Sequence, residues 1–159
     1  MKLFQILAAL LGLVILTGCN SESQTAVAEA AASLPELTAQ PKTGRWYRQD
    51  EALAGRQLFA TNCASCHGRN AVGTADWRTP NSNGQYPPPP LNGSAHAWHH
   101  SYEVLQRVIL EGGAPMGGTM PAWRGRLSAE EIRQVIAGFQ SYWPDQAYQI
   151  WVERERQSR

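Results

Sequence analysis

The feature that most constrains this chain is the pentapeptide Cys63-Ala64-Ser65-Cys66-His67. On a helical turn, side chains at positions i and i+3 lie on the same face, so both thiols point to one side and the adjacent imidazole reaches the same region. Two thiols and a histidine at this spacing are the pattern for covalent attachment of a c-type haem, in which each thiol adds to one vinyl group. The pattern therefore predicts that Cys63, Cys66 and His67 hold one haem c.

Other uses of these residues compete with haem attachment. A thioredoxin-like dithiol requires a preceding strand and a βαβ pattern, and neither is found. A zinc site needs a fourth ligand, often from a second C-x-x-C, which the chain lacks. A disulfide between Cys63 and Cys66 stays open for a chain in an oxidising compartment. Haem attachment is favoured because His67 directly follows the second cysteine.

Residues 1–18 have the composition of an export signal. An apolar run from Leu3 to Leu16 follows one lysine and ends at Thr17-Gly18-Cys19. A run of about 14 residues is shorter than the ~20 that a transmembrane helix needs. The ending resembles the lipobox of bacterial lipoproteins, which implies a signal peptide over residues 1–18 and a lipid on Cys19. Each of the three cysteines then has a role.

Residues 19–47 are rich in Ser, Ala, Glu, Gln and Thr, offer little apolar surface, and are expected to be a flexible tether. The chain has 14 Lys+Arg and 13 Asp+Glu, a net charge of +1 that falls to zero when the leader with Lys2 is removed. A chain near zero charge is not built to bind a polyanion, so nucleic acid is not an expected partner. The remaining length fits one modest domain and a tail.

The first expected helix begins at an Asp50 cap and ends in the haem motif. Its apolar stripe follows helical spacing and contains Ala52, Gly55, Phe59, Cys63 and Cys66. Glycine costs a helix about 1 kcal/mol relative to alanine, so Gly55 predicts the close approach of another helix.

Two further helices are expected nearer the C-terminus. Ser101 caps one that ends at Gly112-Gly113. The capping box Ser128-Ala129-Glu130-Glu131 begins the other, which is expected to run until Pro144. Their apolar stripes contain Val104, Leu105, Val108 and Ile109 in the former and Ile132, Val135, Ile136 and Phe139 in the latter.

Residues 48–143 resemble a monohaem class I cytochrome c. The resemblance implies an all-α fold in which about three main helices surround one covalently bound haem, with long irregular loops. It also implies that Gly55 and Phe59 pack against an aromatic side chain of the last helix, Phe139 or Tyr142. The polar, proline-rich loop after the motif departs from the family, as does the C-terminal extension 144–159.

The second iron ligand is expected in the loop before the last helix, which contains Met116 and Met120. Met120-Pro121-Ala122-Trp123 is similar to the family's methionine-proline-aromatic loop, so the resemblance favours Met120 and leaves Met116 as the alternative. Pro121 stiffens that turn by fixing φ. A thioether ligand stabilises Fe(II) and raises the reduction potential relative to a second imidazole.

The segment 87–90 is four prolines and is expected to be polyproline II. By the resemblance, the Pro89 carbonyl accepts a hydrogen bond from the His67 ring nitrogen that faces away from iron, and Leu91 touches the porphyrin. Such a bond fixes the tautomer of the ligand.

His96, His99 and His100 lie close together in the sequence. Their simplest interpretation is as surface residues. An extra metal site or an alternative haem ligand stays open as a hypothesis, because imidazoles bind copper and zinc. The alternating charges of residues 153–156 are typical of a solvated face.

These patterns together predict a one-electron carrier with His67 and Met120 on the iron, which is not itself an enzyme. It is expected to be exported, lipid-anchored to a bacterial membrane, and facing the periplasm, with redox proteins as partners. Two alternatives are kept: a haem-carrying electron-input subunit of a larger oxidoreductase, and a haem enzyme or gas sensor with a labile sixth ligand.

Overall fold

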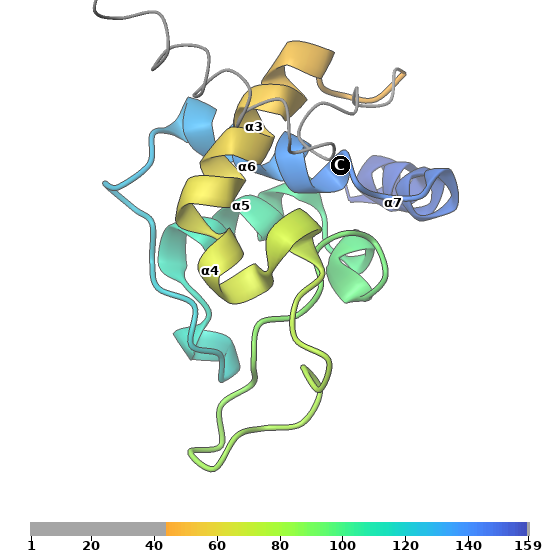
Figure 1. The fold of residues 1–159 in the computed structure, drawn as a ribbon. Coiled ribbons are helices and arrows are strands. Elements are labelled where there is room, and N and C mark those ends of the chain that lie inside the picture. Colours follow the sequence, from red (N-terminus) through yellow and green to blue (C-terminus); the bar gives the residue numbers. More distant parts are fainter. Residues whose placement is uncertain (1–43, 159) are drawn as a thin grey trace, which may run out of the picture. The chain divides into compact units, whose positions relative to one another are not determined.

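The computed structural model describes residues 44–158, and within this range every regular element is a helix (Figure 1). The α-helices are α3 (Gln49–Asn62), α4 (Ala64–His67), α5 (Tyr102–Glu111), α6 (Ala129–Gln140) and α7 (Asp145–Gln157). Short 3₁₀ turns interrupt the irregular chain, namely η1 (Arg69–Ala71), η2 (His96–His99) and η3 (Ala114–Met116). The all-α class expected from the sequence is confirmed.

The backbones of α3 and α6 are in direct contact, and α3 lies across α6 in Figure 1. A Cβ atom at Gly55 would overlap the carbonyl of Gln134, and one at Gly138 would overlap the backbone of Gly55. The close approach predicted at Gly55 is therefore confirmed, but its partner is a second glycine. Of the two expected aromatic partners, Phe139 is buried in the core, whereas Tyr142 stacks against the Arg56 guanidinium at 4.5 Å.

One apolar core joins α3, α5, α6 and α7. Trp143 is completely buried, and its indole meets Trp151 of α7 edge-on with 6.1 Å between ring centroids. The segment predicted as a C-terminal extension is thus a helix whose apolar side, including Tyr148, belongs to the domain core. Most of its charged residues are exposed, and Glu153 and Arg156 form an ion pair. Glu155 is half-buried and accepts a hydrogen bond from the Tyr102 N–H at 2.8 Å, so the predicted solvated face is not fully exposed.

The packed chain begins before residue 48, the start expected for the domain. The Trp46 N–H donates to the Tyr148 hydroxyl at 2.8 Å, and the Trp46 indole N–H donates to Gln140. Tyr47 is buried and packs with Ala52 and Ala137. Polar composition placed the tether boundary at 47, but these two aromatic side chains hold residues 46 and 47 against α3, α6 and α7.

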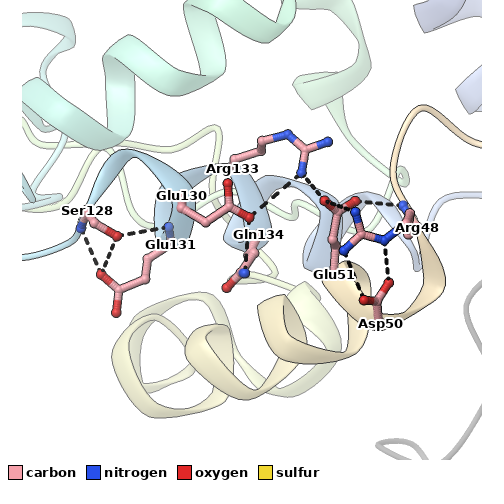
Figure 2. Close-up of polar contacts among 8 residues, drawn as sticks. All are labelled: Arg48, Asp50, Glu51, Ser128, Glu130, Glu131, Arg133 and Gln134. Atoms are coloured by element: carbon pink, nitrogen blue, oxygen red, sulfur yellow. Dashed lines mark hydrogen bonds and ion pairs between the residues drawn. The ribbon is translucent and has the colours of Figure 1, made fainter.

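The start of α3 differs from the sequence expectation because Glu51, rather than Asp50, completes its cap. The cap residue is Arg48, whose N–H donates to the Glu51 carboxylate at 2.7 Å. Arg133 of α6 bonds the same carboxylate, as Figure 2 shows, and its guanidinium lies 4.9 Å from the Trp46 ring centroid. These contacts, led by the Arg48 N–H, hold the pKa of Glu51 below its usual range.

The other predicted helix starts are confirmed. The Ser101 hydroxyl accepts from the Val104 N–H at the start of α5. Ser128 and Glu131 form the expected reciprocal capping box of α6, with backbone bonds of 3.2 and 2.8 Å (Figure 2). However, α6 ends at Gln140, and Pro144 becomes the cap residue of α7.

Among residues 44–158, no helix is both long enough and apolar enough to cross a membrane. The predicted signal peptide 1–18, the predicted lipidation site Cys19 and the tether up to residue 43 lie outside the described residues.

Removing the charge of Glu51 is expected to destabilise the domain in a pH-dependent way. Glu51→Gln should lower the free energy of unfolding by about 1–3 kcal/mol at pH 7, because it weakens hydrogen bonds to a charged, buried acceptor. The folded-state pKa is depressed, so the contribution is complete above the unfolded pKa of about 4.3 and is lost as pH falls through the folded value. Denaturant titrations of haem-loaded protein from pH 7 down to pH 3 measure this difference.

The matched control is Glu153→Gln, which removes an exposed ion pair and should change stability by less than about 0.5 kcal/mol. If the free energies of unfolding of wild type and Glu51→Gln differ as much at pH 3 as at pH 7, the depressed pKa assigned to Glu51 is wrong.

Candidate haem site

His67 ends the short helix α4 and is buried. Its Nδ1 lies 3.0 Å from the carbonyl oxygen of Pro89. Because a carbonyl only accepts, the proton is on Nδ1, and the lone pair of Nε2 is free for a metal. Burial lowers the pKa of His67, which keeps the ring neutral, and the Pro89 bond partly opposes this shift. A neutral imidazole with an anchored N–H is the form that ligates iron.

The proline segment is held in place by backbone hydrogen bonds on both sides of Pro89. The Thr74 N–H donates to the Pro88 carbonyl at 2.9 Å, and the Leu91 N–H donates to the Ala71 carbonyl at 2.8 Å. The indole of Trp143 then donates to the Leu91 carbonyl at 2.7 Å. An irregular segment is therefore positioned by the helical core, which fixes the acceptor for His67.

Met120 is brought in by the turn that ends α5. Gly112 has φ +83°, and a Cβ there would lie 2.7 Å from the Met120 carbonyl, so this position requires glycine. The Gly113 N–H donates to the Met120 carbonyl at 2.9 Å, and the Trp123 N–H donates to the Ile109 carbonyl at 3.0 Å. The Met120 side chain packs against the core, whereas Met116 is 59% exposed.

These elements enclose an apolar pocket between α3, α5 and α6. It is lined by Phe59, Cys63, His67, Leu91, Ile109, Met120, Trp123, Leu127, Val135 and Phe139. The structure thus gathers four of the predicted site residues directly around one space, and Pro89 joins them through its bond to His67. Met116 is not among the lining residues, so the geometry favours Met120 of the two methionines.

Cys66 is exposed and is not among the pocket-lining residues. The predicted single stripe from Ala52 to Cys66 is interrupted because α3 ends at Asn62 and the separate turn α4 begins at Ala64.

The structure does not support the alternative in which Cys63 and Cys66 form a disulfide, because both cysteines are free thiols. Burial raises the pKa of the Cys63 thiol to about 11, and the neighbouring Cys66 adds to the shift. A redox dithiol requires a lowered thiol pKa, so this alternative loses support.

The residues present fit a haem. The pocket has one nitrogen donor from α4, one thioether from the loop before α6, a cysteine beside the histidine, and otherwise apolar walls. This donor set is the one found on the iron of electron-transfer cytochromes, and the dry walls suit a porphyrin. In that arrangement Cys63 and Cys66 would form the thioethers, and His67 and Met120 would ligate the iron.

Several wall residues were missed as site residues by sequence reasoning. Ile109, Val135 and Phe139 were expected only as helix core, and Leu127 was not singled out. Trp123 could have been found from the sequence, because it is the aromatic residue of the Met120 motif. The others carry no local signal, since apolar helical spacing is the same for core and cofactor contacts.

The three neighbouring histidines lie outside this pocket. His96 stacks on Trp77 with 4.8 Å between ring centroids, and His99 stacks on Trp98 at 3.7 Å. Residues 44–158 contain no group of three or more His, Cys, Asp or Glu side chains arranged to hold a metal ion. The hypothesis of an extra metal site or an alternative haem ligand at these histidines is therefore not supported. All three rings make aromatic contacts, because His100 meets His96 edge-on with 5.3 Å between ring centroids.

Known proteins resemble this chain over the same region. Residues 50–137 match the family described as cytochrome C oxidase, cbb3-type, subunit III. The cbb3-type cytochrome c oxidase subunit FixP of Rhizobium meliloti (strain 1021) is 34% identical over 107 residues, 67% of this chain and 31% of that protein. Subunit CcoP of Rhodobacter capsulatus is 35% identical over 94 residues, 55% of this chain and 28% of that protein.

The similar part is thus less than a third of each of these relatives. FixP of Bradyrhizobium sp. (strain ORS 278) is 39% identical over 83 residues, 52% of this chain and 24% of that protein. No solved structure matches the chain.

Replacing the two methionines separately tests the iron ligand. Met120→Ala is expected to abolish the weak far-red band that reports a methionine sulfur on Fe(III), because the only thioether lining the pocket is removed. Met116→Ala, the matched control on the exposed turn, should keep the wild-type spectrum. Absorption spectra of oxidised and reduced haem-loaded protein decide which methionine ligates the iron. Loss of the band in Met116→Ala would assign Met116, rather than Met120, as the ligand.

Proposed function

Because the chain belongs to the family of cytochrome C oxidase, cbb3-type, subunit III, we propose that it binds one covalent haem c and transfers single electrons. The haem, when bound, supplies an iron that takes up and releases one electron. The protein supplies the position and the reduction potential. Pro89 holds the His67 proton on Nδ1, and the apolar walls exclude water from the iron.

The convergence of His67 and Met120 on one apolar pocket is the observation that carries this proposal. His67 and Met120 would both ligate the iron of a bound haem, and such a ligand pair suits electron transfer rather than substrate binding. A haem enzyme or gas sensor needs an iron position that opens readily, and the Met120 side chain in the pocket argues against one. The chain therefore acts as a carrier and performs no bond chemistry itself.

We further infer that this carrier is the electron-input component of a larger membrane oxidoreductase. The similar regions of FixP and CcoP belong to oxidase subunits, which favours a fixed subunit over a freely moving carrier. The described residues form one small domain around one pocket of this kind, so the catalytic step would lie in a partner.

Purification from native membranes tests the subunit role. A C-terminally tagged chain extracted in mild detergent should bring down a larger haem-containing or metal-containing complex in constant proportion. An unrelated tagged lipoprotein from the same membranes is the control and should bring down none of it. Recovery of the cytochrome alone, with its haem intact, would contradict the subunit role and favour a free carrier.

We also propose that the mature chain begins at a lipid-bearing Cys19 and faces the periplasm from a bacterial membrane. The support is the apolar leader that ends in a lipobox-like sequence. Cys19→Ser should lose the lipid, which mass spectrometry of the mature N-terminus detects as a mass lower by the acyl chains. An unmodified wild-type N-terminus would exclude the anchor.

A further inference from the structure

The proline segment that supplies the acceptor for His67 cannot fix its own position. Prolines have no backbone N–H, so residues 87–90 donate no hydrogen bonds and take part only through their carbonyls. The Pro89 carbonyl oxygen lies 3.0 Å from the His67 Nδ1, and its place depends on bonds made by the neighbouring residues. The firmness of those bonds decides how well the imidazole is anchored.

Two hydrogen bonds join the segment to the turn that follows His67. The Thr74 N–H donates to the Pro88 carbonyl at 2.9 Å, and the Leu91 N–H donates to the Ala71 carbonyl at 2.8 Å. Both bonds set the proline segment against that turn. Neither of them ties the segment to one of the long helices of the core.

The indole of Trp143 makes a third bond, and this one comes from the end of the helical core. Its N–H donates to the Leu91 carbonyl at 2.7 Å, two residues after Pro89. The Trp143 side chain is completely buried just past the end of α6. A Cβ at Gly93 would lie 3.2 Å from the Trp143 side chain and 2.9 Å from Pro144, so the chain after the proline segment lies directly against this corner.

The ring of Trp143 is held in place by α7, which follows α6 in Figure 1. Trp151 of α7 meets it edge-on with 6.1 Å between ring centroids, and Phe139 packs against it at 6.3 Å. Trp151 is fixed in turn, because its indole N–H donates to the His100 carbonyl at 2.9 Å. A ring packed this closely cannot turn its N–H away without displacing its neighbours. The family match ends at residue 137, so Trp143 and α7 both lie outside it.

We propose that Trp143, held by α7, is a positioning residue for His67 and thereby sets the reduction potential of the bound haem. This inference rests on the proposed function. The route runs from Trp143 through Leu91 to Pro89, whose carbonyl keeps the proton on the His67 Nδ1. That hydrogen bond makes the opposite ring nitrogen a stronger electron donor to a metal, which stabilises Fe(III) and lowers the potential. Without the Trp143 bond the anchor is weaker and the potential is higher.

An isosteric replacement separates the donated bond from the packing. 3-Benzothienylalanine at position 143 of the full-length, haem-loaded protein has a ring system of nearly the same shape, with sulfur in place of the indole N–H. In reduced protein the His67 Nδ1 proton, followed by NMR, should exchange with solvent about tenfold faster, which corresponds to about 1.4 kcal/mol, near the net worth of one hydrogen bond. In a potentiometric titration the Fe(III)/Fe(II) equilibrium should shift toward Fe(II) by about threefold, a rise of roughly 30 mV for a one-electron couple. Trp143→Phe removes the same donor and should shift both readouts in the same direction.

The matched control is the same analogue at position 46. The Trp46 indole N–H donates to Gln140, away from the route to Pro89, so proton exchange and potential should keep their wild-type values. Retention of the far-red band in each variant shows that the methionine ligand is unchanged, so that a shift in potential reports the histidine side.

Two replacements at position 151 test the part played by α7. Trp151→Leu removes the ring that meets Trp143 and should move both readouts in the same direction as the analogue at position 143. The analogue at position 151 loses only the bond to the His100 carbonyl and keeps the ring, so both readouts should stay at wild type. Wild-type values in Trp151→Leu would contradict the role of α7.

The positioning role itself has two outcomes that would overturn it. One is wild-type proton exchange and potential with the analogue at position 143, even if that variant is less stable in denaturant. The other is an equally large shift with the analogue at position 46. A chain that carries no covalent haem would instead overturn the proposed function.

Discussion

The backbone contact between α3 and α6 is the interaction on which the rest of this structure depends. Gly55 and Gly138 allow two helices to touch without intervening side chains, and any Cβ at either position would overlap the opposite helix. The contact places the end of α3, and therefore Cys63 and His67, beside Val135 and Phe139 of α6. Glu51 and Arg133 add an ion pair between the same two helices (Figure 2).

The site itself is built mainly from irregular chain that the helices position. Pro89, Leu91 and Met120 lie in segments without regular structure. These segments are held by backbone hydrogen bonds to Ala71 and Gly113 and by a hydrogen bond from the Trp143 indole. This arrangement lets a small core bring His67 and Met120, from separate segments, to one space. Precise placement of iron ligands needs such supporting bonds, because a loop without them would sample many geometries.

The loops that flank the site carry both apolar and charged side chains. Val72, Tyr86 and Met116 are exposed on them, and Arg124 and Arg126 lie between the pocket-lining residues Trp123 and Leu127. A net charge near zero gives little long-range steering, so recognition of a partner would depend on contact at short range. Such an arrangement suits a carrier that is kept near its partner by an anchor or within a complex.

The sequence alone determined the cofactor chemistry and the helical frame. The spacing of Cys63, Cys66 and His67, the Ser101 and Ser128 caps, and the need for a close neighbour at Gly55 are local properties of the chain. Only the tertiary structure decided that Gly138 is that neighbour, that Met120 rather than Met116 lines the pocket, and that α7 joins the core. The physical reason is that caps and helical stripes act over a few residues, whereas these contacts join segments far apart in the chain and depend on how the whole core packs.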